Sequence, residues 1–240
     1  MRFYKFFISI FLIFTVCFYI TTPVFSEETT YVWSPNNNSL NDSTNDNSSQ
    51  ITETNSEVDE SNSLSLESGS AILIEQTTGQ VLYSHNAHEQ LRPASVTKVM
   101  SILLIMEALD SNKISLTDSV PCSENAASMG GSQIWLDPRE TLTVDEMLKA
   151  ICVNSANDCV VAMSEFIAGS EEAFVQLMND KAKELGMNDT CFKNCHGLDE
   201  DGHVTSAYDI SLMSRELLVN HPTITNYTTI WTDTLRNRKI

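Results

Sequence analysis

A sharp change in composition near residue 70 decides which part of the chain can fold. Residues 27–69 are rich in Asn, Ser, Thr, Asp and Glu, and they contain nine acidic residues but no Lys or Arg. Such a segment cannot bury enough apolar surface to offset the entropy lost when a chain becomes ordered. The sequence therefore predicts a disordered acidic tether over residues 27–69 and a folded domain over residues 70–240.

The first 26 residues have the pattern of a secretory signal peptide. Arg2 and Lys5 precede an apolar run over residues 6–20, and the small residue Ser26 stands before a plausible cleavage point. An uncleaved membrane anchor is the alternative, but the apolar run is short for a helix that must cross a bilayer. We therefore expect an exported, extracytoplasmic protein.

The net charge excludes two classes of partner. The whole chain carries −18, of which the leader gives +2, the tether −9 and residues 70–240 −11. A domain this acidic repels nucleic acid and anionic membrane surfaces. We expect no nucleic-acid partner, and membrane contact only through the leader or through a C-terminal anchor absent from these residues.

The cysteines predict neither a disulfide scaffold nor a metal site. Five of the six follow the leader: Cys122, Cys152, Cys159, Cys191 and Cys195. An odd count leaves at least one thiol free, and a domain of this size can build its own core. The pattern C-x-x-x-C-H over residues 191–196, with His203 beyond it, does not match the closed zinc patterns. No metal or cofactor is expected, and the state of Cys152 and Cys159 stays open.

The folded part begins with strands and continues with helices. Residues 71–74 and 81–84 are predicted to pair as strands around a turn at residues 77–80. A helix is predicted from Ala94 to about Leu109, with Val99, Leu103 and Met106 on one buried face.

More helices follow in the second half of the chain. Thr143 and Glu146 have the spacing of a capping box, which predicts a helix start at Thr143. Further helices are predicted from about Val160, over residues 170–185 and over residues 208–220, with Gly186 ending the second of these. Strands at the start and helices in the middle indicate an α+β fold, in which a helical cluster packs on an antiparallel sheet.

Ser95 and Lys98 form the first candidate catalytic pair. They stand three residues apart at the start of the predicted helix, so both side chains lie on one helical face. A Ser hydroxyl whose proton can be taken by a neighbouring amine is an activated nucleophile. The pattern S-x-x-K also occurs by chance on many solvated helix faces, so the two residues alone do not establish catalysis.

Ser155 and Asn157 form a second polar pair, sixty positions after Ser95 and in a predicted break between helices. A polar loop is the ordinary interpretation of an isolated S-x-N. Following an S-x-x-K in an exported acidic domain, the pair favours a catalytic interpretation.

With both pairs in place, residues 70–231 resemble the penicillin-interacting serine peptidases, and among them the D-alanyl-D-alanine carboxypeptidases of the low-molecular-mass penicillin-binding proteins. The matching stretches are residues 78–83, 92–98, 130–132, 134–136 with Glu140, 154–158, 192–198 and 202–209. The resemblance implies a β-lactamase/DD-peptidase-like fold and no cofactor. It also implies peptidoglycan stem peptides ending in D-Ala-D-Ala as substrate, β-lactams as covalent inhibitors, and a place at the bacterial cell wall.

The resemblance assigns a role to each of the four residues. Ser95 would attack the carbonyl of the penultimate D-alanine and form an acyl-enzyme, with Lys98 as general base once burial has lowered its pKa. Ser155 would pass the proton to the departing D-alanine, and Asn157 would hold the peptide backbone of the substrate. The Ser95 backbone N–H would be one oxyanion donor.

One motif of the family has no counterpart here. A K-T-G strand would bind the substrate carboxylate and supply a second oxyanion N–H, but no such tripeptide occurs. We expect a chain that stops before this strand and lacks the sheet strands after it, with an incomplete catalytic site. An inactive remnant or a domain that senses penicillin or cell-wall peptides is therefore the alternative function. A class A β-lactamase is a further alternative, but its nearest deacylating candidate, Glu216, lies within a predicted helix.

Overall fold

The computed structural model describes residues 64, 66–236 and 238–239, all of which lie in one compact unit, residues 62–240. The predicted signal peptide (residues 1–26) and nearly all of the predicted tether lie outside the described residues, so both stay predictions. Within the described part, no helix is long and apolar enough to cross a membrane.

The described elements are short strands and helices, and helices follow one another without a strand over residues 144–228. In chain order they are β1 (Ala71–Ile74), β2 (Val81–His85), the 3₁₀ helix η2 (Ala94–Thr97), α2 (Lys98–Asp110), β3 (Ser119–Pro121), α3 (Glu124–Ala127), β4 (Thr141–Thr143), α4 (Val144–Asn154), α5 (Asn157–Ala168), α6 (Glu171–Glu184), α7 (Ala207–Asn220), the 3₁₀ helix η3 (Pro222–Ile224), α8 (Thr225–Thr228), β5 (Thr234–Leu235) and β6 (Arg238–Lys239).

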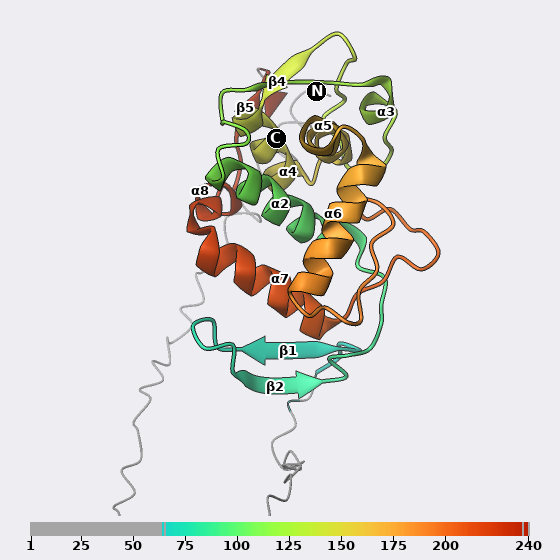
Figure 1. Ribbon diagram of the computed structural model, residues 1–240, viewed down its shortest axis with the longest axis vertical. Coiled ribbons are helices and arrows are strands. Elements are labelled where there is room, and N and C mark those ends of the chain that lie inside the picture. Colours follow the sequence, from blue (N-terminus) through green and yellow to red (C-terminus); the bar gives the residue numbers. More distant parts are fainter. Residues whose placement is uncertain (1–63, 65, 237, 240) are drawn as a thin grey trace, which may run out of the picture. The chain divides into compact units, whose positions relative to one another are not determined.

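The described strands form three antiparallel pairs, β1 with β2, β3 with β4 and β5 with β6. The predicted opening hairpin is confirmed, with Ala71 opposite His85 and Leu73 opposite Tyr83. Helix α7 packs along β1, between the hairpin and α2 (Figure 1). The α+β class predicted from the sequence is confirmed.

Helix α2 is the centre of the helical cluster, because α5, α6 and α7 all pack against it (Figure 1). The prediction of a single buried face was wrong. Val99 is only partly buried, whereas residues 100–106 are all buried. A helix that packs against neighbours on every side has no solvated polar face. Its sequence therefore shows no clear alternation between an apolar and a polar face.

The predicted helix ends are mostly correct, because local side chains set them. The Thr143 hydroxyl accepts a hydrogen bond from the Glu146 N–H, and the Glu146 carboxylate accepts one from the Thr143 N–H, so the capping box is confirmed. Helices α6 and α7 end within a residue of their predicted bounds. The helix expected from about Val160 starts three residues earlier, at Asn157, because the break before it is only two residues long.

Candidate active site

Ser95 and Lys98 lie where η2 passes into α2. Ala94, at φ +46°, turns the chain into η2 and leaves Ser95 exposed at its first turn. Lys98 begins α2 and is only 3% exposed. The Lys98 Nζ lies 3.2 Å from the Ser95 Oγ, as the i, i+3 spacing predicts. The first-turn N–H groups of a helix lack intrahelical partners, which suits the Ser95 N–H as an oxyanion donor.

Burial makes Lys98 a usable base. Desolvation is the largest influence on the Lys98 amine and lowers its pKa to about 8. The Nζ also donates to the carbonyl oxygen of His196 at 2.7 Å, which fixes the direction of the amine. About a tenth of the amine is therefore neutral at pH 7 and about half at pH 8, and one Nζ hydrogen is held away from Ser95.

Three polar side chains of η2 and α2 are buried because they form hydrogen bonds with one segment that is distant in the sequence. Thr97 bonds the His203 Nε2 at 2.8 Å, Lys98 bonds the His196 carbonyl, and Ser101 donates to the Cys195 carbonyl at 2.6 Å. The Lys193 N–H donates to the His203 Nδ1, so the neutral ring carries its proton on Nε2 and donates it to Thr97. Residues 193–203 thus form the wall facing Lys98.

Gly197 brings this wall against the turn that carries Ser95. Its φ is +93°, and a Cβ built on it would lie 1.9 Å from the Ala94 carbonyl oxygen and 3.0 Å from the Thr97 Oγ1. Only glycine allows so close an approach at that backbone angle. Sequence reasoning included residues 192–198 in the resemblance but assigned no role to them, because their contacts lie about a hundred positions away.

Ser155 and Asn157 lie at the junction of α4 and α5. Ser155 has φ +55° and ends α4 in the left-handed conformation, and its hydroxyl has no hydrogen-bond partner among the described residues. Asn157 is the first residue of α5 and is 3% exposed. No hydrogen bond within the described part joins either residue to Ser95 or Lys98.

The glycine loop before Ile134 holds Asn157 in place. The Asn157 N–H donates to the Ser132 carbonyl at 2.7 Å, and its Nδ2 donates to the Gly130 carbonyl at 2.8 Å. A Cβ on Gly131 would lie 2.8 Å from that Nδ2 and 3.5 Å from Leu198, so the glycine loop lies between Asn157 and Leu198. The Asn157 Oδ1 is buried without a partner in the described residues. Buried polar atoms are rarely left without a partner, so this one marks Asn157 as a candidate functional residue.

Asp158 is a further site residue to which sequence reasoning gave no role. It is fully buried, and its carboxylate accepts the N–H groups of Ile134 (3.1 Å) and Leu136 (3.0 Å). It thereby anchors the loop that contacts Asn157. The available signal in the sequence was an acidic residue directly after S-x-N, because a carboxylate that is buried there needs several hydrogen-bond donors.

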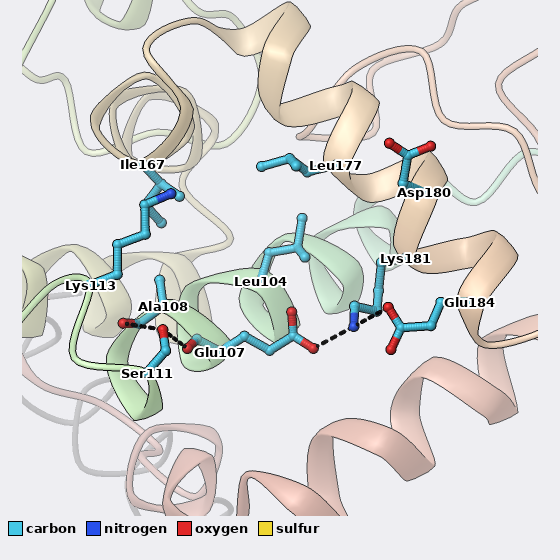
Figure 2. A pocket seen from close by; sticks show the side chains of 10 residues that line it. All are labelled: Leu104, Glu107, Ala108, Ser111, Lys113, Ile167, Leu177, Asp180, Lys181 and Glu184. Carbon is cyan, nitrogen blue, oxygen red and sulfur yellow. Dashed lines mark hydrogen bonds and ion pairs between the residues drawn. The ribbon is translucent and has the colours of Figure 1, made fainter.

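A pocket lies elsewhere, between α2, α5 and α6 (Figure 2). Leu104, Ile167 and Leu177 contribute its apolar lining, and Lys181 bridges Glu107 at 2.8 Å and Glu184 at 2.7 Å on its rim. None of the four candidate residues lines it.

The cysteines and histidines of the wall are engaged in other contacts. All five described cysteines, Cys152 and Cys159 among them, are unpaired in the structure. Within the described residues, no group of three or more His, Cys, Asp and Glu side chains is placed to hold a metal ion.

A serine hydroxyl, a buried lysine of low pKa and a helix N-terminus are the groups that acyl transfer through a serine requires. A family model described as D-alanyl-D-alanine carboxypeptidase matches residues 54–240. The chain belongs to this family.

Individual proteins of this kind are similar to the chain in sequence and in structure. The chain is 58% identical over 173 residues to the D-alanyl-D-alanine carboxypeptidase DacF of Bacillus subtilis, covering 72% of this chain and 44% of that protein. Penicillin binding protein 6B from Escherichia coli is similar in structure, with a TM-score of 0.69 and 33% identity over 72% of this chain and 56% of that one. The ampicillin-bound form of penicillin-binding protein D2 from Listeria monocytogenes is also similar in structure, with a TM-score of 0.65 and 28% identity. The similarity covers 74% of this chain and 72% of that one. The chain thus spans less than half the length of DacF.

Proposed function

We propose that the protein containing this chain is a serine-type D-Ala-D-Ala carboxypeptidase of peptidoglycan, acylated by β-lactams. One observation carries the proposal: the Lys98 amine, 3% exposed and with its pKa lowered to about 8, lies 3.2 Å from the exposed Ser95 hydroxyl. Membership of the family and the similarity to an ampicillin-bound relative support it. The protein would act outside the cytoplasm, at the cell wall.

The reaction would proceed in two acyl transfers, first from the peptide to Ser95 and then from Ser95 to water. Neutral Lys98 takes the Ser95 proton as the Ser95 oxygen bonds the carbonyl carbon of the penultimate D-alanine. The terminal D-alanine leaves with a proton relayed by Ser155, and an ester on Ser95 remains. Water then hydrolyses the ester, which releases the shortened peptide and restores the hydroxyl. Asn157 would hold the peptide backbone of the substrate, as the resemblance to the family implies.

Release of free D-alanine from a peptide ending in D-Ala-D-Ala tests this function directly. Wild-type protein should release it, and Ser95→Ala should not. Ser84→Ala, an exposed residue of β2, is the matched control and should behave as wild type. Equal release by wild type and Ser95→Ala would refute the proposal.

The pH dependence of acylation should follow the Lys98 amine. Since its pKa is lowered from 10.5 to about 8, the neutral base is scarce below pH 7 and dominant above pH 9. The acylation rate constant should therefore rise about tenfold per unit below pH 7, reach half its maximum near pH 8 and stay level above pH 9. Stopped-flow measurement with a fluorescent penicillin checks this. A rate that is flat between pH 6 and pH 9 would rule out Lys98 as the base.

A further inference from the structure

Two successive carbonyl groups of one loop hold two side chains of α2. We call residues 194–198 the carbonyl loop. The Cys195 carbonyl accepts from Ser101 at 2.6 Å, and the His196 carbonyl accepts from Lys98 at 2.7 Å. The direction of the Lys98 amine therefore depends on where the carbonyl loop is held.

Glu171 holds the opposite side of the carbonyl loop. Its Oε1 accepts the Cys195 N–H at 3.2 Å and the Cys195 thiol at 3.3 Å, and lies 3.5 Å from the His196 Nε2. The Leu198 N–H donates to the His196 Nδ1, so the neutral ring carries its proton on Nε2, towards Glu171. One carboxylate oxygen thus contacts both residues whose carbonyls face α2.

The position of Glu171 in the fold makes it a firm anchor. It is the first residue of α6, where the helix dipole stabilises a carboxylate, and its side chain is 17% exposed. Helix α6 also fixes the chain that enters the loop, because Asn179 bonds both the N–H and the carbonyl of Phe192 at 2.9 Å. The loop cannot shift without breaking its contacts to α6.

We propose that Glu171 is a positioning residue for Lys98, acting through Cys195 and His196. It fixes the His196 carbonyl that directs the Lys98 amine towards Ser95. The proposal rests on the proposed function for its kinetic consequence, but its structural consequence does not need catalysis. When Glu171 is shortened, the loop loosens, water reaches Lys98, and the pKa of the amine rises towards its ordinary value because burial is what lowers it.

The kinetic test compares wild type and four variants of the protein that contains this chain, using a fluorescent penicillin. Glu171→Ala and Glu171→Asp should slow acylation about tenfold without weakening the initial noncovalent binding, since Asp keeps the charge but is too short to reach both residues. Glu171→Gln keeps the accepting oxygen and should stay within about threefold of wild type. Glu172→Ala removes the neighbouring carboxylate of the same helix turn, which is exposed, and should match wild type. Unchanged acylation by folded Glu171→Asp would overturn the proposal.

A second measurement separates this proposal from the proposed function. In protein labelled with ¹³C-lysine, the Lys98 resonance is the one missing from Lys98→Met, and its titration gives the pKa. Glu171→Asp should raise that pKa by at least one unit, and Glu172→Ala should leave it unchanged. If wild type is not acylated but this shift is seen, the function fails and the positioning role holds. An unchanged Lys98 pKa in folded Glu171→Asp would refute the positioning role.

Discussion

Replacing Lys98 with methionine is expected to remove acylation while making the protein no less stable. Methionine keeps the length and volume of the side chain but has no basic nitrogen. Loss of a general base costs about 10²–10⁴ in rate, so the acylation rate constant should fall by that factor. The measurement is stopped-flow acylation at pH 8, beside urea unfolding at pH 7.

The stability result follows from the cost of burying a charge. The Lys98 pKa is lowered from 10.5 to about 8, so the protonated side chain opposes folding at pH 7, where both the folded and unfolded chains are charged. Each pKa unit is worth about 1.4 kcal/mol, which sets an upper limit of about 3 kcal/mol on the cost. The His196 carbonyl loses its donor in the variant, so we expect a net gain on the order of 1 kcal/mol.

The pH dependence of that gain is a second check. A folded-state pKa below the unfolded one means that folding releases protons as pH passes from 8 to 10.5. The wild type should therefore gain stability relative to Lys98→Met across that interval. Lys149→Met, at a lysine paired with Asp145 on α4, is the matched control and should be acylated at the wild-type rate. Wild-type acylation by Lys98→Met would contradict the catalytic role.

Gly197→Ala should destabilise the protein and disrupt the Ser95 turn together. The new Cβ would lie 1.9 Å from the Ala94 carbonyl oxygen, at φ +93°. Overpacking costs about 1–3 kcal/mol, and a positive φ about 1–2 kcal/mol for a residue with a Cβ. We expect a loss of about 3 kcal/mol in urea unfolding, and acylation slowed at least tenfold in the fraction that remains folded.

Gly169→Ala separates the cost of the positive φ from the cost of the steric clash. Gly169 has φ +87°, but no atom lies within 4 Å of the position its Cβ would take. This variant should lose only the cost of the backbone angle, about 1 kcal/mol, and keep the wild-type acylation rate. Equal effects of the two substitutions would show that the contact between Gly197 and Ala94 is unimportant.

Features set by neighbouring residues could be predicted from the sequence. The capping box at Thr143, the opening hairpin and the Ser95–Lys98 contact each depend on side chains a few positions apart. The start of α5 was misplaced because Ser155 takes a left-handed conformation, which shortens the break before Asn157.

Features set by distant backbone atoms could not be predicted. The resemblance implied a buried Lys98, but the sequence did not show which residues would bury it or Ser101, and the structure buries both. Their partners are the backbone carbonyls of His196 and Cys195, and every residue type carries a carbonyl. Nothing in the side chains of the carbonyl loop therefore marks the contact in the sequence.

The central claim is that Ser95 is the nucleophile, and locating the bound drug tests it most directly. The protein is incubated with a labelled penicillin and cleaved after glutamate, which releases residues 90–107 with both Ser95 and Ser101. Fragment mass spectrometry should find one penicilloyl group on Ser95, and Ser95→Ala should carry none. A label on any other residue, or one that survives Ser95→Ala, would contradict the account.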